Sequence, residues 1–341
     1  MNVILVVLIC FSVFSCNGRD VSSPRGYSRS IERVRLEPVL VAEALVTNFP
    51  SAMKVYNDYI IVLNPFLRDG FLSIYDRHTG KELNTVGTLG RGPGESIQPY
   101  IGNIYEDKLL IFELGANRKA LIVIDSLLAL KFNPIRYSDS PIQDFIYRTI
   151  KIDNGLFVSS VFDDWRQPFK VHNESSVIKY FGKPPIRNTN DFPQGGTEYH
   201  VRKQQIFFYN SRNPYIACYQ RFDDNSFTLN WENQFIKPRY SIYNDKISWR
   251  EEQSSGIMGI AFTNKYIVCL RNELKLREIR GRETSTAPRS LYLFDYQGNL
   301  VKIVDLIDPS IRIASEEDSD IVYILSVEPD FNIVKYDLSE I

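Results

Sequence analysis

A short phrase of two turn-forming residues followed by an apolar run occurs six times along this 341-residue chain. The clearest copies read NDYIIV, NPYIAC and NKYIVC. The six copies begin at Asn57, Glu106, Asp153, Asn213, Asn264 and Ser319, at intervals of 47 to 60 residues. Asn and Asp favour turns, and the aliphatic and aromatic run after them favours a buried strand. This repeat constrains the fold most, because one structural unit must stack on copies of itself.

A second phrase, an apolar strand that ends in Asp and precedes a Gly, follows in the first and fifth units. It reads Phe71–Asp76 before Gly80, and Leu291–Asp295 before Gly298. This is the pattern of two strands joined by a tight hairpin. Antiparallel strands repeated about every 50 residues are typical of a β-propeller blade, whereas a parallel solenoid needs shorter repeats. Two β-sandwiches would not explain six copies of one phrase.

The sequence therefore predicts an all-β fold, a six-bladed β-propeller of four-stranded antiparallel blades over residues 36–341. Long helical periodicity is absent, and only residues 126–131 favour a helical turn. An apolar run, Val39–Val46, precedes the first copy of the phrase. We expect this N-terminal strand to complete the last blade and close the ring, because closure pairs sheet edges that would otherwise be exposed.

Composition supports a folded chain and excludes two classes of protein. Hydrophobic residues make up 44% of the chain and aromatic residues 13%, which argues for strands and against disorder. The net charge of −1 offers no bulk positive charge for binding nucleic acid. With only 3 His, the chain has little material for His-based catalysis or metal binding, and we expect neither a metal nor a cofactor.

The first 15 residues have the pattern of an export signal. Asn2–Ser15 is apolar, carries no charged side chain and is too short to span a membrane. It ends in Val13–Cys16, which reads VFSC: an aliphatic residue, a tolerant position, a small residue and Cys. Residues 16–35 lack apolar periodicity and are predicted to form a tether. The alternatives are an ordinary secretory signal or a buried strand, with Cys16 incidental.

The most distinctive string, GRGPGE, lies between the first two units. Its residues are Gly90, Arg91, Gly92, Pro93, Gly94 and Glu95. Pro followed by Gly favours a type II turn. An ion pair between Arg91 and Glu95 would add at most about 1 kcal/mol at an exposed site. The spacing is not that of a phosphate-binding loop. We predict a structural turn, with ligand contact as the alternative.

VFSC resembles the lipobox of bacterial lipoproteins. Together with the repeats and GRGPGE, it resembles the TolB-like six-bladed β-propeller lipoproteins of Gram-negative bacteria, over about residues 40–341. The resemblance implies cleavage after Ser15 and a lipid anchor on Cys16. It also implies a place in the cell envelope, with the outer membrane favoured over the inner. Most members of that family are uncharacterised, so the resemblance implies fold and location rather than an activity.

Four residues are candidates for ligand binding: Trp165, His200, Arg277 and Arg280. An indole at position 165, in an expected hairpin turn, could stack on a sugar or peptide. His200 is the best catalytic candidate among the His residues, and its alternative is a polar residue that opens a strand. The two Arg residues lie in a charged insertion, 271–283, which either binds a partner or forms a solvated hairpin.

Other polar and sulfur-containing residues have structural explanations. We expect Cys218 and Cys269 to be buried and unpaired, because equivalent positions on neighbouring blades lie about 10 Å apart and a disulfide needs about 7 Å. His78 is expected in a solvated turn, and His172 lacks metal-ligand spacing. Acidic clusters, at 163–164, 223–225 and 316–318, lack the pattern of an EF-hand, and solvated turns are expected for the first two.

The sequence thus predicts a membrane-anchored, monomeric and non-catalytic propeller that binds a protein, peptide or glycan through its loops. The alternative is a secreted hydrolase or lyase, which would need several convergent ionisable residues at the channel mouth. A structural or assembly role in the envelope is a third possibility. No catalytic residue is assigned, because neither a G-x-S-x-G nor an H-E-x-x-H motif occurs.

Overall fold

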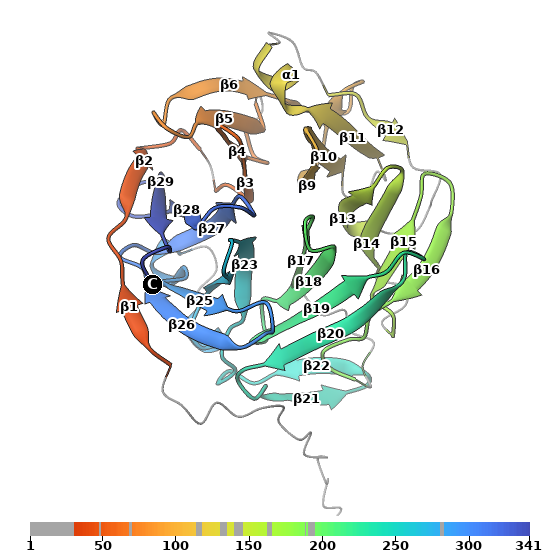
Figure 1. Cartoon of the computed structure of the whole chain (residues 1–341), viewed down its shortest axis with the longest axis vertical. Coiled ribbons are helices and arrows are strands. Elements are labelled where there is room, and N and C mark those ends of the chain that lie inside the picture. The colour runs from red at the N-terminus through yellow and green to blue at the C-terminus, as the bar shows by residue number, and fades with distance from the viewer. Residues whose placement is uncertain are drawn as a thin grey trace, which may run out of the picture.

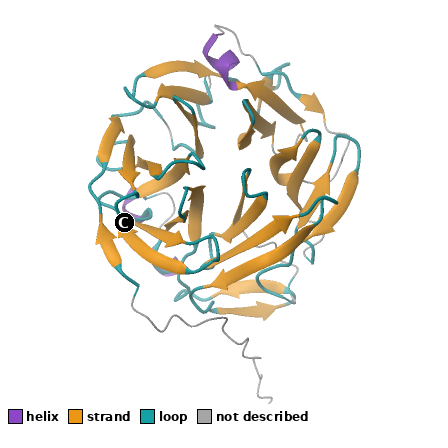
Figure 2. Cartoon of the chain, in the orientation of Figure 1, coloured by secondary structure: helices purple, strands orange, loops and turns teal. Residues whose placement is uncertain are grey.

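Six antiparallel sheets stand around a central axis in the structure, which is a computed structural model (Figure 1). The residues described are 31–341 apart from 48, 68–69, 114–117, 130–134, 140–145, 162–165, 188, 190–194 and 280–282. Strands dominate this part of the chain, and its single α-helix is short (Figure 2). No helix formed by these residues is long and apolar enough to cross a membrane. The predicted six-bladed propeller is confirmed.

The first three blades are each made of four consecutive strands, which follow one another from the axis outwards. Blade 1 contains β3 (Ala52–Tyr56), β4 (Tyr59–Leu63), β5 (Leu72–Asp76) and β6 (Glu82–Val86). Blade 2 contains β9 (Pro99–Tyr105), β10 (Lys108–Glu113), β11 (Arg118–Val123) and β12 (Ser138–Asp139). Blade 3 contains β13 (Ile146–Asp153), β14 (Leu156–Val161), β15 (Phe169–His172) and β16 (Val177–Phe181).

The last three blades follow the same plan, except at their outer edges. Blade 4 contains β17 (Gly195–His200), β18 (Gln205–Asn210), β19 (Tyr215–Arg221) and β20 (Phe227–Gln234). Blade 5 contains β23 (Ile257–Phe262), β24 (Ile267–Arg271), β25 (Ser290–Phe294) and β26 (Leu300–Asp305). Blade 6 contains β27 (Ser310–Ser315), β28 (Ile321–Ser326), β29 (Asn332–Asp337) and the N-terminal β2 (Val39–Ala42).

The innermost strand of each blade contacts the innermost strands of both neighbours, so these strands enclose a channel. We call the face where the inner strands begin the upper face, and the face where they turn into the second strands the lower face. Two small two-stranded sheets lie in connections on the upper face: the parallel pair of β7 (Thr88–Leu89) and β8 (Glu95–Ser96), and the antiparallel hairpin of β21 (Tyr240–Tyr243) and β22 (Lys246–Trp249).

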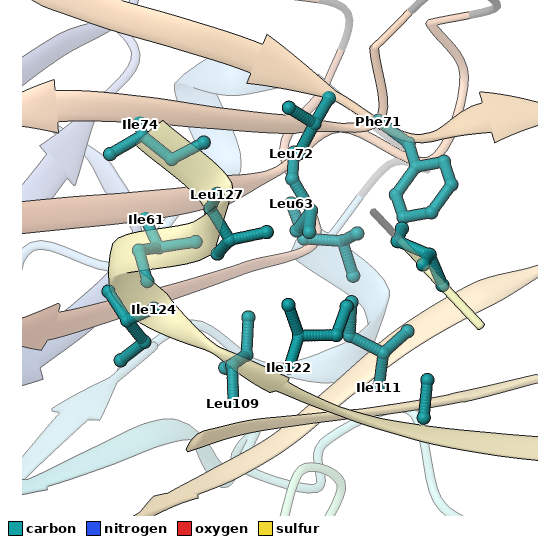
Figure 3. Close-up of a cluster of buried hydrophobic side chains, with 13 residues drawn as sticks. Ile61, Leu63, Phe71, Leu72, Ile74, Leu109, Ile111, Ile122, Ile124 and Leu127 are labelled. Atoms are coloured by element: carbon teal, nitrogen blue, oxygen red, sulfur yellow. The ribbon is translucent and has the colours of Figure 1, made fainter. Parts of the chain in front are cut away.

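Apolar side chains between neighbouring blades form the core. Between blades 1 and 2, Ile61 and Leu63 of β4 face Leu109 and Ile111 of β10, and all four are fully buried (Figure 3). Helix α1 (Ile124–Ala129) adds Leu127 to the same cluster, so the predicted helical turn is present and covers the edge of this core. The β-branched and aliphatic runs of the repeat supply this packing in each blade.

An N-terminal strand completes the last blade and closes the ring, as predicted, and a second, unpredicted strand precedes it. β2 pairs antiparallel with β29 and becomes the outermost strand of blade 6. Before it, β1 (Arg33–Arg35) pairs parallel with β26 as a fifth strand of blade 5. The structure therefore puts the end of the expected tether inside the propeller. One segment thus joins two blades, and it lies beside the last strands of the chain (Figure 1).

Five copies of the repeated phrase lead into the second strand of their blades, but the copy at Asn213 leads into β19, the third strand. That assignment was wrong, and the equivalent segment is Lys203–Phe208, which leads from the turn into β18. The second and third strands are both buried and both follow a turn, so their local patterns are alike. Cys218 and Cys269 are therefore not equivalent, although both are buried free thiols in one cluster.

Candidate functional site

A cavity of about 660 Å³ occupies the upper part of the channel, and inner strands of all six blades line it. Tyr100 and Met258 are among its apolar lining residues. Cavities of this size hold small ligands or short peptide segments when a few polar groups fix the orientation. The charged side chains in the wall are therefore the groups that decide what the cavity binds.

One ion pair crosses the channel. Lys54 of β3 places its Nζ 2.7 Å from Oε2 of Glu198 on β17, and both side chains are about four-fifths buried. These strands belong to blades 1 and 4, which are opposite in the ring. The negative charge of Glu198 is therefore already engaged by a partner, and the pair leaves the remaining charges of the cavity positive.

Two guanidinium groups supply those charges, Arg148 from β13 and Arg312 from β27, on the opposite blades 3 and 6. Burial, with a contribution from the nearby charge of Arg148, lowers the pKa of Arg312 to about 10. Arg312 donates to the carbonyl of Ile311, whereas its Nε has no hydrogen-bond partner among the described residues, and no described carboxylate forms an ion pair with it. A partly buried cation without a carboxylate partner attracts an anion.

Tyr209 joins this cluster from the end of β18. Burial raises the pKa of its hydroxyl to about 12, and Arg148 forms a hydrogen bond with it. The ring reaches the channel because Gly196 of β17 has no side chain, since a Cβ there would lie 1.9 Å from the ring. At neutral pH the hydroxyl is protonated, so it adds a donor and no negative charge.

At the lower end of the channel, the turn between β27 and β28 reaches two other blades. Glu316 pairs with Arg77 of blade 1, and Asp318 pairs with Arg202 of blade 4 at 2.6 Å. Burial would raise the pKa of Glu317, but hydrogen bonds from His200 and from two backbone N–H groups lower it below its usual value. This acidic cluster is therefore used in contacts between blades.

His200, the predicted catalytic candidate, is buried outside the cavity lining. Its Nδ1 lies 2.9 Å from Glu317, and its Nε2 lies 3.1 Å from the hydroxyl of Tyr296. Its ring also packs on Phe262, with ring centroids 5.0 Å apart. These contacts join blades 4, 5 and 6. His200 is the last residue of β17, so it ends a strand and does not open one as the alternative supposed.

The GRGPGE loop forms a turn on the upper face, outside the cavity lining. Gly94 has a φ of 78° and Glu95 N donates to Gly92 O at 3.0 Å, which fits a type II turn. The expected ion pair with Arg91 is absent from this loop, all of which the structure describes. Glu95 Oε2 instead accepts a hydrogen bond from Gly92 N at 2.6 Å. The carboxylate thus holds the loop in shape.

The described part of the charged insertion, residues 271–279 and 283, is folded. A 3₁₀ turn, Leu276–Glu278, lies within it, and backbone N–H groups of Leu276 and Arg277 donate to carbonyls of the segment before β23. The Arg277 side chain is exposed and pairs with Glu252. Arg271, at its start, is fully buried under Tyr292. The insertion therefore braces the upper face beside blade 5.

Three candidate residues, Cys16, Trp165 and Arg280, lie outside the described residues. His78 is exposed in its predicted turn and lies 2.9 Å from Asp58. His172 is buried in blade 3, where its Nε2 lies 2.8 Å from the Ser159 hydroxyl. In the described part of the chain no group of His, Cys, Asp and Glu is arranged to hold a metal ion.

The four charged residues of the channel were missed by the sequence analysis. They are Lys54, Arg148, Glu198 and Arg312. Each lies within the first strand of a blade, three to seven residues before the turn that leads into the second strand. A charge in a strand that packs on two neighbours is costly unless it faces a polar space. That pattern was the available signal, although it does not show which charges meet.

Comparison with known families gives a direct result. The profile described as "TolB-like 6-blade propeller-like" matches residues 32–312. The chain belongs to this TolB-like family. The match covers the inner strands of blades 1 to 5 and the start of the inner strand of blade 6, and it supports the family resemblance found in the sequence. Comparison with curated proteins gives no match.

Two solved structures share the architecture of this TolB-like propeller. A putative exported protein from Bacteroides fragilis has 10% sequence identity and a TM-score of 0.59, over 89% of this chain and 97% of that one. A member of the DUF4221 family from Bacteroides vulgatus has 11% identity and a TM-score of 0.57, over 88% and 97%. At such identities the likeness concerns the fold alone.

Proposed function

We propose that this TolB-like propeller is a monomeric, exported binding protein that takes an anionic group of its ligand into the upper mouth of the channel. The observation that carries the proposal is Arg312, a partly buried guanidinium with which no described carboxylate forms an ion pair and which shares the cavity with Arg148. A carboxylate beside Arg312 would accept hydrogen bonds from its guanidinium and offset the repulsion between the two cations. The apolar wall would hold the rest of the ligand.

A peptide carrying carboxylates fits this cavity best. Its volume suits a few residues, and Tyr100 and Met258 offer apolar contact beside the charges. A partner protein could supply such a segment from a terminus or a loop. This is the peptide form of the binding role that the sequence predicts.

The test is calorimetric titration with triglutamate, and with triglutamine as a neutral probe of similar shape. We expect the wild-type protein to bind triglutamate more tightly, and Arg312→Gln to weaken that binding by about tenfold to a hundredfold, since a charge-assisted hydrogen bond is lost. Arg289→Gln is the matched control, because Arg289 is exposed and pairs with Glu328 away from the cavity. Equal binding of both peptides, or an Arg312→Gln protein that binds normally, would disprove the proposal.

The hydrolase or lyase alternative has less support in this cavity. Its described lining holds one carboxylate, Glu198, which Lys54 engages, and it holds no His. General acid–base catalysis needs a pair of groups with separate protonation roles. The convergent cations suit electrostatic recognition better than proton transfer.

For the anchor, we propose lipidation of Cys16 and attachment to the outer membrane. The VFSC pattern supports it, and a structural relative is itself named a putative exported protein. Metabolic labelling with a fatty-acid analogue should label the wild-type chain and the control Cys10→Ala, but not Cys16→Ala. Labelled protein should fractionate with outer membranes. A Cys16→Ala protein that still carries label would refute the anchor.

A further inference from the structure

A second cleft, of about 650 Å³, lies at the lower face between blades 4 and 5. It is separate from the channel cavity, and the two share no lining residue. Six residues line it: Lys203, Gln205, Asn230, Trp231, Tyr296 and Gln297. They comprise two aromatic rings, three carboxamides and one ammonium group. None of these six described residues carries a carboxylate, so Lys203 sets the charge of the cleft.

Gln205, which lines the cleft, carries a buried acceptor without a donor. The Gln205 side chain is more than nine-tenths buried, and its Nε2 donates to Gln220 Oε1 at 3.0 Å. Its own Oε1 has no hydrogen-bond partner among the described residues. A buried polar atom of this kind is destabilising, and a ligand hydroxyl that donates to it would remove the deficit.

The two aromatic rings are fixed in place before any ligand arrives. The indole N–H of Trp231 donates to Tyr296 O at 3.0 Å, and the ring packs on Gly298, where a Cβ would lie 2.6 Å away. The Tyr296 hydroxyl donates to Thr263 O at 2.6 Å. Both rings remain partly accessible in the cleft. A rigid aromatic surface lowers the entropy cost of binding.

The polar groups surround these rings. Lys203 holds its Nζ 4.2 Å from the centre of the Tyr296 ring. A β-bulge in β20 makes Asn230 an extra residue beside Trp231, which leaves its side chain exposed, as is that of Gln297. Bulges commonly redirect side chains at binding sites. The cleft thus combines flat apolar surface, amide donors and acceptors, and one cation.

We infer that this cleft binds an acidic saccharide. A pyranose ring presents a C–H face that can lie on an aromatic ring, and hydroxyl groups that both donate to and accept from carboxamides. A hydroxyl of the sugar donates a hydrogen bond to Oε1 of Gln205, and a uronate carboxylate lies near Lys203. This site is independent of the peptide-binding function proposed for the channel.

The test follows the indole ¹H–¹⁵N signal of Trp231, assigned by its loss in Trp231→Phe, during titration with tetragalacturonate or the neutral maltotetraose. We expect a saturable shift with both, and tighter binding of tetragalacturonate by about threefold. Gln205→Met keeps the length of the side chain but removes the acceptor, and should weaken both by about fivefold to tenfold. Arg312→Gln should leave the shift unchanged, which separates this site from the channel.

Lys203→Gln should abolish the preference for the acidic probe while leaving maltotetraose binding unchanged. Its matched control is Arg202→Gln, one residue away on the same turn, where the cation pairs with Asp318 outside the cleft. Circular dichroism establishes that each variant is folded. The inference is overturned if neither oligosaccharide moves the Trp231 signal at millimolar concentration, or if folded Gln205→Met binds both as the wild type does.

Discussion

Removal of residues 31–47 is expected to lower the melting temperature by about 10 °C or more. The deletion removes β1 and β2, and it leaves the outer strands β26 and β29 as open edges. Several backbone hydrogen bonds at about 1 kcal/mol each, together with the burial of Ala42, amount to about 5 kcal/mol. For a chain of this size each 1 kcal/mol shifts the midpoint by about 2 °C.

Differential scanning calorimetry measures this effect, with a chain that lacks only residues 1–30 as the control. The control should melt like the longer protein, because both closing strands remain. Removal of residues 31–36 alone should give an intermediate value, since β2 still completes blade 6. A chain without residues 31–47 that melts at the control temperature would show that the strands do not hold the ring closed.

Acidification from pH 7 to pH 4 is expected to cost about 3 kcal/mol of stability through His172 alone. Burial lowers the pKa of this imidazole from 6.5 to about 4, and the charges of Lys119 and Lys170 contribute. Below pH 6.5 the unfolded chain takes up a proton that the folded chain does not, so stability is lost as the pH falls towards 4. The expected loss of stability is the difference in the pKa of His172 between the unfolded and the folded chain, multiplied by about 1.4 kcal/mol per pKa unit.

The hydrogen bonds of His172 explain why the folded protein favours its neutral imidazole. Nδ1 of His172 lies 3.0 Å from the carbonyl of Asn173, so it carries the proton, and Nε2 accepts from the Ser159 hydroxyl. Ser159 in turn lies 2.9 Å from Thr149, beside the channel wall. A second proton on this ring would therefore have to displace a hydrogen bond in a buried site.

Urea unfolding at a series of pH values tests this expectation in the wild type, in His172→Gln and in the control His78→Gln. The wild type and the control should lose stability in parallel between pH 6.5 and pH 4, because both retain His172. The His172→Gln protein should have a flatter profile over the same range, even if it is less stable at pH 7. Three parallel profiles would contradict the role assigned to His172.

The sequence predicted the fold because each blade is specified locally. A turn pair such as Asn57–Asp58 and the apolar strand after it are recognised from a few adjacent residues, and the repeat presents the same unit six times. The same locality explains the error at Asn213, since the second and third strands of a blade share one pattern. It also explains why β1 was missed, because a three-residue strand has little periodicity.

The candidate site depended on information that is not local. Trp165, Arg280 and Cys16 remain sequence predictions, and His200 proved to be a contact between blades. The residues that line the channel occur in the sequence as single charges in unrelated strands. Those of the lower cleft come from two blades and from turns that the sequence placed only approximately.

By itself, the sequence determined the number of blades, the strand that closes the ring and the membership of the TolB-like family. Only the tertiary structure decided that Lys54 meets Glu198 and that Arg148 meets Arg312. These partners are separated by more than a hundred residues. Their contact exists because closure of six similar blades brings the same point of each inner strand to one axis. Local sequence patterns specify each blade, but which charges meet at the axis is decided only when the ring closes.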